Sequence, residues 1–119
     1  MQQIMLKSKL HRARVTDVLI DYEGSIEIDE DLMDQVGILT HEQVHVFNIN
    51  NGHRFITYAI PGERGGQTIS VNGAAAHLAK INDRIIIVAY GIMSHDHEST
   101  SPRVLVLDEN NKVVKKKGM

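Results

Sequence analysis

The sequence predicts a mainly β protein, most simply a small closed barrel with two or three short helices. Two observations carry this prediction. Short runs of apolar and β-branched residues recur along the chain, and turn pairs such as Asn51-Gly52 separate them. Many short strands with few helices favour a barrel, because closure removes exposed sheet edges. With 119 residues, the chain is expected to form a single domain, 1–119, around one core.

The first half of the chain predicts three strands, one helix and a hairpin. Apolar residues alternate loosely over 4–10, β-branched residues are enriched over 13–21, and 25–29 alternates as a half-buried strand does. A helix is predicted over 29–36, since Asp29 can cap its start and Gly37 can end it. Strands over 44–48 and 54–60 then form a hairpin, and Pro61-Gly62 is expected to end the second of them.

The second half predicts three more strands and a second helix. A strand over 68–71 leads through Asn72-Gly73 into an alanine-rich helix over 74–80. The continuous apolar run over 84–90 is typical of a buried central strand, and a last strand is predicted over 104–107. The basic run 115–117 is expected to be a solvated tail.

Composition excludes several classes of function. The chain has no cysteine, so catalytic thiolates, disulfides and cysteine metal sites are excluded. The formal net charge of −2 gives no support for a nucleic-acid partner, because such proteins usually carry a basic surplus. No segment reaches the roughly 20 apolar residues of a membrane span, and the N-terminal segment lacks the apolar run of a signal peptide. A cytoplasmic location without membrane contact is expected.

Gly24-Ser25 is the first candidate for chemistry. In most sequences such a pair is an ordinary turn. It can also be a self-cleaving bond, because glycine accepts strained backbone angles and the serine hydroxyl can attack the glycine carbonyl, giving an N→O acyl shift. The pair alone does not decide between the two interpretations.

Polar residues on two predicted strands are the next candidates. Lys9 and His11 lie two apart and share a face, which gives a cationic ledge unless that face is simply solvated. Arg54 is suited to bind a carboxylate, Thr57 to support an oxyanion and Tyr58 to donate a proton. On an ideal strand Arg54 and Tyr58 share a face, whereas Thr57 points to the other side.

Two further segments allow a functional interpretation. Asn72-Gly73-Ala74-Ala75-Ala76 combines a turn with a helix start, whose backbone N–H groups can hold an anion, although a plain capped helix explains it too. The pair His95 and His97 is the best of the histidine clusters, but no third ligand stands at a recognisable spacing, so no metal site is predicted.

Five strings of the sequence stand in an order and spacing that together are highly specific. They are MLKSKLHR at 5–12, YEGS at 22–25, NGHRFITYAI at 51–60, ERG at 63–65 and SVNGAAAH at 70–77. In these strings, and in length and layout from about residue 5 to 90, the chain closely resembles aspartate 1-decarboxylases. No string matches beyond about residue 94.

The resemblance implies a double-ψ β-barrel, assembled as a homotetramer with active sites between adjacent subunits. It implies a zymogen that cuts itself between Gly24 and Ser25 into a β chain, 1–24, and an α chain, 25–119. Ser25 then becomes a covalent pyruvoyl group, whose carbonyl forms a Schiff base with the substrate amine. The implied reaction is decarboxylation of L-aspartate to β-alanine, a precursor of pantothenate and coenzyme A. Whether a maturation factor assists the cut is left open.

The resemblance also implies a role for each matching residue. Ser25 is the nucleophile and pyruvoyl source, and Thr57 supports the oxyanion during cleavage and lies in the substrate pocket. Lys9 and Arg54 bind the substrate carboxylate, and Tyr58 reprotonates the carbanion. The pocket wall and its donors are implied at Asn72, Gly73, Ala74 and Ala75, with His11 and Tyr22 close by.

Three other interpretations stay open from the sequence. The chain could be a non-catalytic barrel that binds protein or nucleic acid, which leaves the Lys, His, Arg, Thr and Tyr set beside a Gly-Ser turn unexplained. It could be a metal-dependent hydrolase that uses its histidines, an interpretation that activity after chelation contradicts. It could also be a family member that has lost processing and acts as a structural subunit, which an intact mass distinguishes from an active enzyme.

Overall fold

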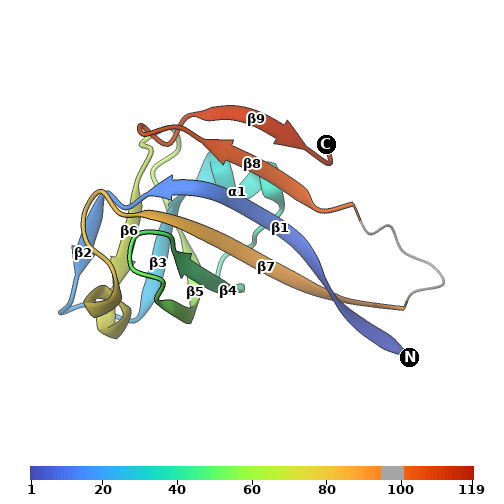
Figure 1. The fold of residues 1–119 in the computed structure, drawn as a ribbon, viewed down its shortest axis with the longest axis horizontal. Helices are drawn as coiled ribbons and strands as arrows, with labels where there is room; N and C mark the ends of the chain where they lie inside the picture. The colour runs from blue at the N-terminus through green and yellow to red at the C-terminus, as the bar shows by residue number, and fades with distance from the viewer. Residues whose placement is uncertain (95–100) are drawn as a thin grey trace.

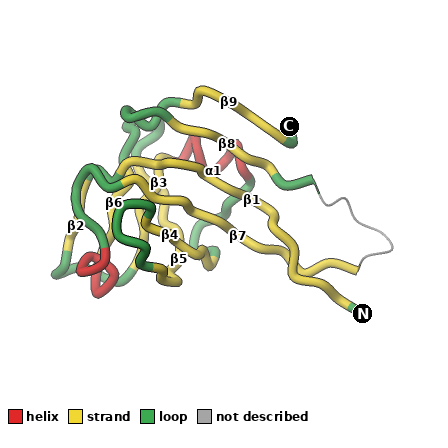
Figure 2. The backbone as a smooth tube through the Cα atoms, viewed as in Figure 1, coloured by secondary structure: helices red, strands yellow, loops and turns green. Residues whose placement is uncertain are grey.

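A computed structural model describes residues 1–94 and 101–119, and over these residues nine strands join into one sheet with two short helices (Figures 1 and 2). The predicted mainly β class with short helices is confirmed. In chain order the elements are β1 (Gln2–Arg14), β2 (Asp17–Leu19), β3 (Ser25–Asp29), α1 (Glu30–Val36), β4 (Gln43–Asn48), β5 (Arg54–Gly62), β6 (Ile69–Asn72), the 3₁₀ helix η1 (Gly73–Leu78), β7 (Arg84–Ser94), β8 (Arg103–Leu107) and β9 (Val113–Lys117).

The strand order is β2-β6-β3-β5-β4-β7-β1-β8-β9. Three neighbouring pairs are parallel, namely β1 with β8, β2 with β6, and β3 with β5, while the other neighbours are antiparallel. Strands of a parallel pair cannot be joined by a tight turn, so the chain must cross over other strands between them. Such crossed parallel pairs fit the predicted double-ψ β-barrel.

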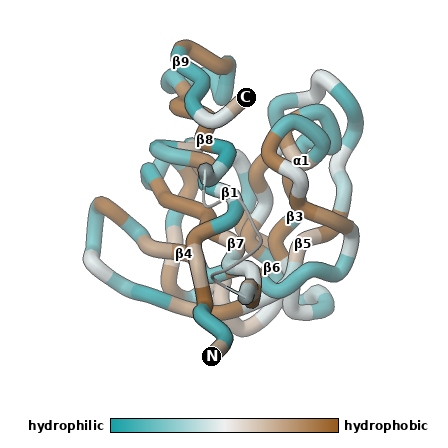
Figure 3. Tube along the Cα trace, turned by 90° about the vertical axis from the view of Figure 1, so that its right-hand side faces the viewer, coloured by the Kyte–Doolittle hydropathy of each residue, from teal (hydrophilic) through white to brown (hydrophobic). Residues whose placement is uncertain are grey.

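The core lies on one face of the strands, and hydrophobic and hydrophilic segments alternate along them in Figure 3. Leu10 on β1 lies opposite Ile87 on β7, which lies opposite Val46 on β4, and all three are buried. The adjacent row runs from Lys9 through Val88 and His45 to Ile56 on β5. Because successive strand residues point to opposite faces, this second row defines the outer face of the sheet.

Helix α1 starts and stops where the sequence predicts. The Asp29 carboxylate accepts a hydrogen bond from the Asp31 amide, and Gly37 ends the helix at a left-handed φ of 76°. The same carboxylate also accepts from the amides of Gly65 and Gln67, at 3.1 and 2.9 Å. Arg64, directly before Gly65, forms ion pairs with three acidic side chains of α1, those of Glu30, Asp31 and Asp34. The string ERG at 63–65 therefore fastens the loop after β5 to α1.

Two predictions for the strands in the N-terminal half were wrong in extent. The segments 4–10 and 13–21 are one long strand, β1, and the short strand β2. A bulge between Leu10 and Ala13, with Arg12 at φ 67°, lets β1 continue while pairing with both β7 and β8. Strand β5 does not end at Pro61-Gly62, because both residues pair with β3 on the one side that has a partner there.

Two predictions near the C-terminal half also needed correction. The alanine-rich helix expected over 74–80 is a 3₁₀ helix over Gly73–Leu78. The basic run 115–117 is not a free tail, because it forms β9 and pairs with β8, with Lys116 opposite Leu105. Its side chains stay exposed, so the run satisfies the backbone of an edge strand while its charges remain in water.

Candidate active site

Ser25 is the first residue of β3 and is 1% exposed. Its hydroxyl donates a hydrogen bond to the carbonyl of Glu23 at 3.1 Å and accepts one from Asn72 Nδ2 at 3.1 Å. The second contact follows from the fold, because Ser25 and Asn72 are opposite each other in the β3–β6 pair. The Gly24–Ser25 peptide therefore enters the sheet with its serine hydroxyl already held.

Asn72 does not cap the helix that follows it. It precedes η1, yet its side chain makes no capping hydrogen bond there. Its Oδ1 accepts from Ser70 Oγ at 2.8 Å, and its Nδ2 donates to Ser25. Of the two explanations for the segment 72–76, the plain capped helix is therefore not the one that the Asn72 side chain fits.

Gly73 lies against the peptide that precedes Ser25. A Cβ built on Gly73 would stand 2.7 Å from Gly24 Cα, 2.8 Å from Gly24 N and 3.1 Å from the Tyr22 carbonyl. Gly73 also has a φ of +76°, which side-chain-bearing residues rarely adopt. Glycine is thus required here both by conformation and by the close approach of the two chain segments.

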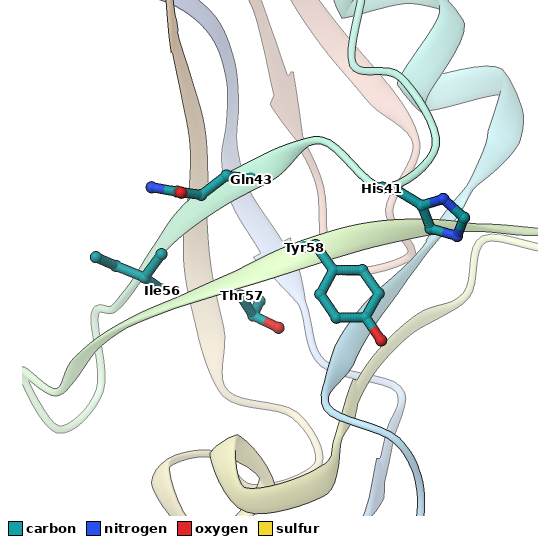
Figure 4. Close-up of a pocket in the computed structure, with 5 residues that line it drawn as sticks. All are labelled: His41, Gln43, Ile56, Thr57 and Tyr58. Atoms are coloured by element: carbon teal, nitrogen blue, oxygen red, sulfur yellow. The ribbon is translucent and has the colours of Figure 1, made fainter.

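Tyr58 lies beside Ser25 on the neighbouring strand. Ile26 and Ala59 are partners in the parallel β3–β5 pair, so the residues directly before them, Ser25 and Tyr58, are the next two neighbours. Tyr58 and Thr57 line an open pocket of about 530 Å³ with His41, Gln43 and Ile56. In Figure 4 the Tyr58 and His41 rings lie side by side at one end of this pocket, and their centroids are 6.0 Å apart.

Lys9 and His11 share the outer face, as predicted, because the alternate residues Ser8 and Leu10 are buried. His11 Nδ1 is buried without a hydrogen-bond partner. Burial lowers the pKa of His11 from its ordinary value, and the neighbouring charge of Lys9 lowers it further. Along the sheet, this pair is separated from Ser25. Strands β5, β4 and β7 lie between β3 and β1, and at the usual strand spacing β3 and β1 are about 19 Å apart along the sheet.

Arg54 is the first residue of β5, the strand next to β3, and stands four residues before Tyr58. It shares the outer face with Tyr58, as predicted, but its guanidinium lies over the ring of Phe47, 4.3 Å from the centroid. Phe47 and Arg54 are opposite each other in the β4–β5 hairpin. Sequence reasoning missed Phe47, because a two-residue turn at Asn51-Gly52 would place Ile49, and not Phe47, opposite Arg54.

The other predicted positions lie near Ser25. Tyr22 is about half exposed, Ala74 is exposed, and Ala75 packs on the core beside the start of η1. His95 and His97 lie outside the described residues. Among residues 1–94 and 101–119, no group of three His, Asp or Glu side chains could hold a metal ion. No helix in those ranges is long and apolar enough to cross a membrane.

Comparison with known proteins decides the family. The family model described as aspartate decarboxylase matches residues 1–114. The chain belongs to the aspartate decarboxylase family. The match includes every site position discussed above, from Lys9 to Ala75.

Curated members of the aspartate decarboxylase family are similar over nearly the whole chain. The aspartate 1-decarboxylase of Maricaulis maris is 56% identical, over 98% of this chain and 97% of that protein. That of Thermoanaerobacter pseudethanolicus is 55% identical, over 96% of this chain and 98% of that protein. Among solved structures, the rationally designed mkDPBB_sym_86 protein gives a TM-score of 0.49 at 8% identity, over 65% of this chain and 90% of that chain.

Proposed function

We propose that this chain is a carboxy-lyase that converts L-aspartate to β-alanine and CO₂, using a pyruvoyl group made from its own Ser25. The observation that carries the proposal is the buried Ser25 hydroxyl, held between the Glu23 carbonyl and Asn72 Nδ2 at the Gly24–Ser25 bond. It stands in a chain whose family is named for aspartate decarboxylation. A serine that served only in a turn would not need a buried hydroxyl.

Self-cleavage begins with attack of Ser25 Oγ on the Gly24 carbonyl carbon. The Oγ–C bond forms, the C–N bond of the peptide breaks, and the hydroxyl proton ends on the Ser25 nitrogen. Removal of the Ser25 α-proton then breaks the Cβ–Oγ bond of the ester, which leaves a chain that ends in the Gly24 carboxylate. Uptake of one water and release of ammonia at the Ser25 α-carbon leave a pyruvoyl group at position 25. Thr57, on the strand next to β3, is assigned to support the oxyanion of the attacked carbonyl.

The surroundings of Ser25 fit a pyruvoyl group. Asn72 Nδ2 supplies a hydrogen-bond donor beside the Ser25 side chain, as a carbonyl oxygen requires. Space is free on the side of Gly24 that faces away from Gly73, since a Cβ built on Gly24 meets nothing within 4 Å, so the new Gly24 terminus has room to withdraw on that side. A bound pyruvoyl carbonyl supplies an electron sink for the substrate amine, the task that pyridoxal phosphate performs elsewhere.

The remaining site residues take the substrate and its proton. Tyr58, beside Ser25, is assigned to donate a proton to the α-carbon after CO₂ leaves. Lys9 and Arg54 are assigned to bind the carboxylate that stays, because paired cations hold a carboxylate strongly. Asn72 and the backbone of Gly73, Ala74 and Ala75 form the wall of the pocket, with His11 and Tyr22 close to it.

We infer that the site is completed by neighbouring copies in a homotetramer. Lys9 is half-buried on β1, which three strands separate from β3, and the exposed Arg54 has its guanidinium over the Phe47 ring, so a second copy is the source of cations that this geometry favours. The outer face also carries large exposed apolar side chains, including Ile56 at 60%, Ile92 at 66% and Ile4 at 73%. Apolar groups gathered on one face are a common feature of subunit interfaces.

The proposal places the chain in the cytoplasm, in the supply of β-alanine for pantothenate and coenzyme A. The domain remains one unit, 1–119, after the cut into 1–24 and 25–119. Whether a maturation factor assists the cleavage is a separate question. Incubating purified precursor alone distinguishes spontaneous from assisted cleavage.

The test is the intact mass of the purified protein under denaturing conditions, followed by an assay of β-alanine from aspartate. We expect two chains that meet at Gly24–Ser25, the longer one lighter than its hydrolysis product by one ammonia. Activity should survive chelation, which opposes a metal-dependent hydrolase. A chain that stays uncut after warming and makes no β-alanine would contradict the proposal. It would favour a non-catalytic barrel that binds protein or nucleic acid, or a family member that acts as a structural subunit.

A further inference from the structure

Three buried side chains form one directional hydrogen-bond relay that ends at the cleavage site. Ser70 Oγ donates to Asn72 Oδ1 at 2.8 Å, Asn72 Nδ2 donates to Ser25 Oγ at 3.1 Å, and Ser25 Oγ donates to the Glu23 carbonyl at 3.1 Å. Ser70, Asn72 and Ser25 are 3%, 1% and 1% exposed, so bulk water cannot replace a missing partner.

The direction of the relay fixes how the Asn72 amide is turned. Ser25 gives its only proton to Glu23, so it offers Asn72 its lone pairs and requires the NH₂ end of the amide. The oxygen end then faces Ser70, whose hydroxyl supplies the donor it needs. Without Ser70, a buried acceptor is left unsatisfied. A half-turn of the amide would then present its oxygen to Ser25 and draw the hydroxyl proton away from Glu23.

We propose that Ser70 is a positioning residue for self-cleavage, acting through Asn72 to hold the Ser25 hydroxyl in the rotamer that attacks Gly24. This inference rests on the proposed cleavage at Gly24–Ser25 and adds to it a residue with no direct contact to the bond. Attack requires the oxygen to stay close to the carbonyl, and rotamers that leave that position lower the rate in proportion to their population.

The chain contains a matched control in Ser8. Its side chain is likewise buried, at 0% exposure, and its hydroxyl donates to the Val36 carbonyl at 2.6 Å. Ser8 lies on β1, which β5, β4 and β7 separate from β3. Replacing either serine with alanine removes the same hydroxyl and one buried hydrogen bond, but only one of the two changes reaches Ser25.

The experiment follows the intact mass of purified precursor at fixed temperature for the wild type, Ser70→Ala, Ser70→Thr and Ser8→Ala, with the thermal midpoint of each. Ser70→Ala should cleave about tenfold more slowly, the effect of one lost buried hydrogen bond on a rate. Ser8→Ala should lower the thermal midpoint yet cleave at the wild-type rate, and Ser70→Thr, which keeps the hydroxyl, should recover most of the rate.

Equal cleavage rates for Ser70→Ala and wild type overturn the inference and leave the proposed function intact. Equal slowing in Ser70→Ala and Ser8→Ala also overturns it, because both would then act through stability alone. A wild-type chain that never cuts at Gly24–Ser25 overturns the proposed function, and this inference with it.

Discussion

The region around the Gly24–Ser25 bond and the outer face of strands β1, β4, β5 and β7 differ in how complete they are. Around the bond, Ser25, Asn72 and Ser70 are buried and hydrogen-bonded to one another within one chain. On the outer face, Lys9 and Arg54 lie on different strands, Lys9 half-buried and Arg54 exposed. The groups of the proposed self-cleavage are therefore in contact within one chain, whereas the groups of the proposed carboxylate site are not in contact with each other.

The largest effect should come from removing the nucleophile. Ser25→Ala has no hydroxyl to attack Gly24, so neither cleavage nor β-alanine formation is expected, while the fold is retained. Intact mass and an aspartate assay measure both. Any chain break at this bond in Ser25→Ala would show that another group attacks Gly24. The region around Ser25 would then not hold all the groups that cleavage needs.

Tyr58→Phe tests whether a side chain of the outer face acts in turnover and not in cleavage. The variant should still cleave, since Tyr58 is not assigned to that step, but its kcat should fall by about 10²–10⁴-fold for loss of a general acid. Tyr90→Phe is the control, because Tyr90 is exposed on the same face and its ring contacts His45 at 5.1 Å. Unchanged kcat in Tyr58→Phe removes Tyr58 from the role of proton donor.

Gly73→Ala tests the close approach at the bond. Its Cβ would meet Gly24 at 2.7 Å, so the segment before Ser25 must shift, and cleavage should slow by about 10- to 100-fold. Gly52→Ala has nearly the same positive φ, 77°, with nothing within 4 Å of the new Cβ. If both variants cleave equally slowly in a timed mass measurement, backbone strain and not contact with Gly24 explains the loss.

The smallest of these effects is expected from Arg54→Ala. Loss of one charged contact to a substrate carboxylate should raise KM about tenfold and leave cleavage unchanged. Arg64→Ala removes the same charge where it only pairs with α1, so its KM should match the wild type. A higher KM in both variants would point to net charge and not to binding by Arg54.

Much of this arrangement could be predicted from local sequence. Asp29 and Gly37 set the bounds of α1, and Asn51-Gly52 sets the hairpin, because caps and tight turns depend on a few adjacent residues. The candidates near Ser25 came from short strings that stand together in the chain.

What could not be predicted depends on contacts between distant segments. The continuation of β1 through a bulge requires β7 and β8 on its two sides, and the pairing of residues 113–117 requires β8. The relay from Ser70 needs β3 and β6 in one register, which no local pattern carries. The separation of Lys9 from Ser25 by three strands of the sheet follows only from the strand order.

The place of residues 1–24 in the sheet decides what the proposed cut leaves behind. Strand β1 lies between β7 and β8, and β2 pairs with β6 at the edge of the sheet, so the short fragment stays hydrogen-bonded to strands of the long one. Before the cut, unfolding and refolding are events of a single chain. Afterwards two separate polypeptides must find each other again, and heat resistance should become dependent on protein concentration. A molecule that has made its reactive group by the proposed cut can therefore no longer refold as a single chain, and the cut cannot be repeated.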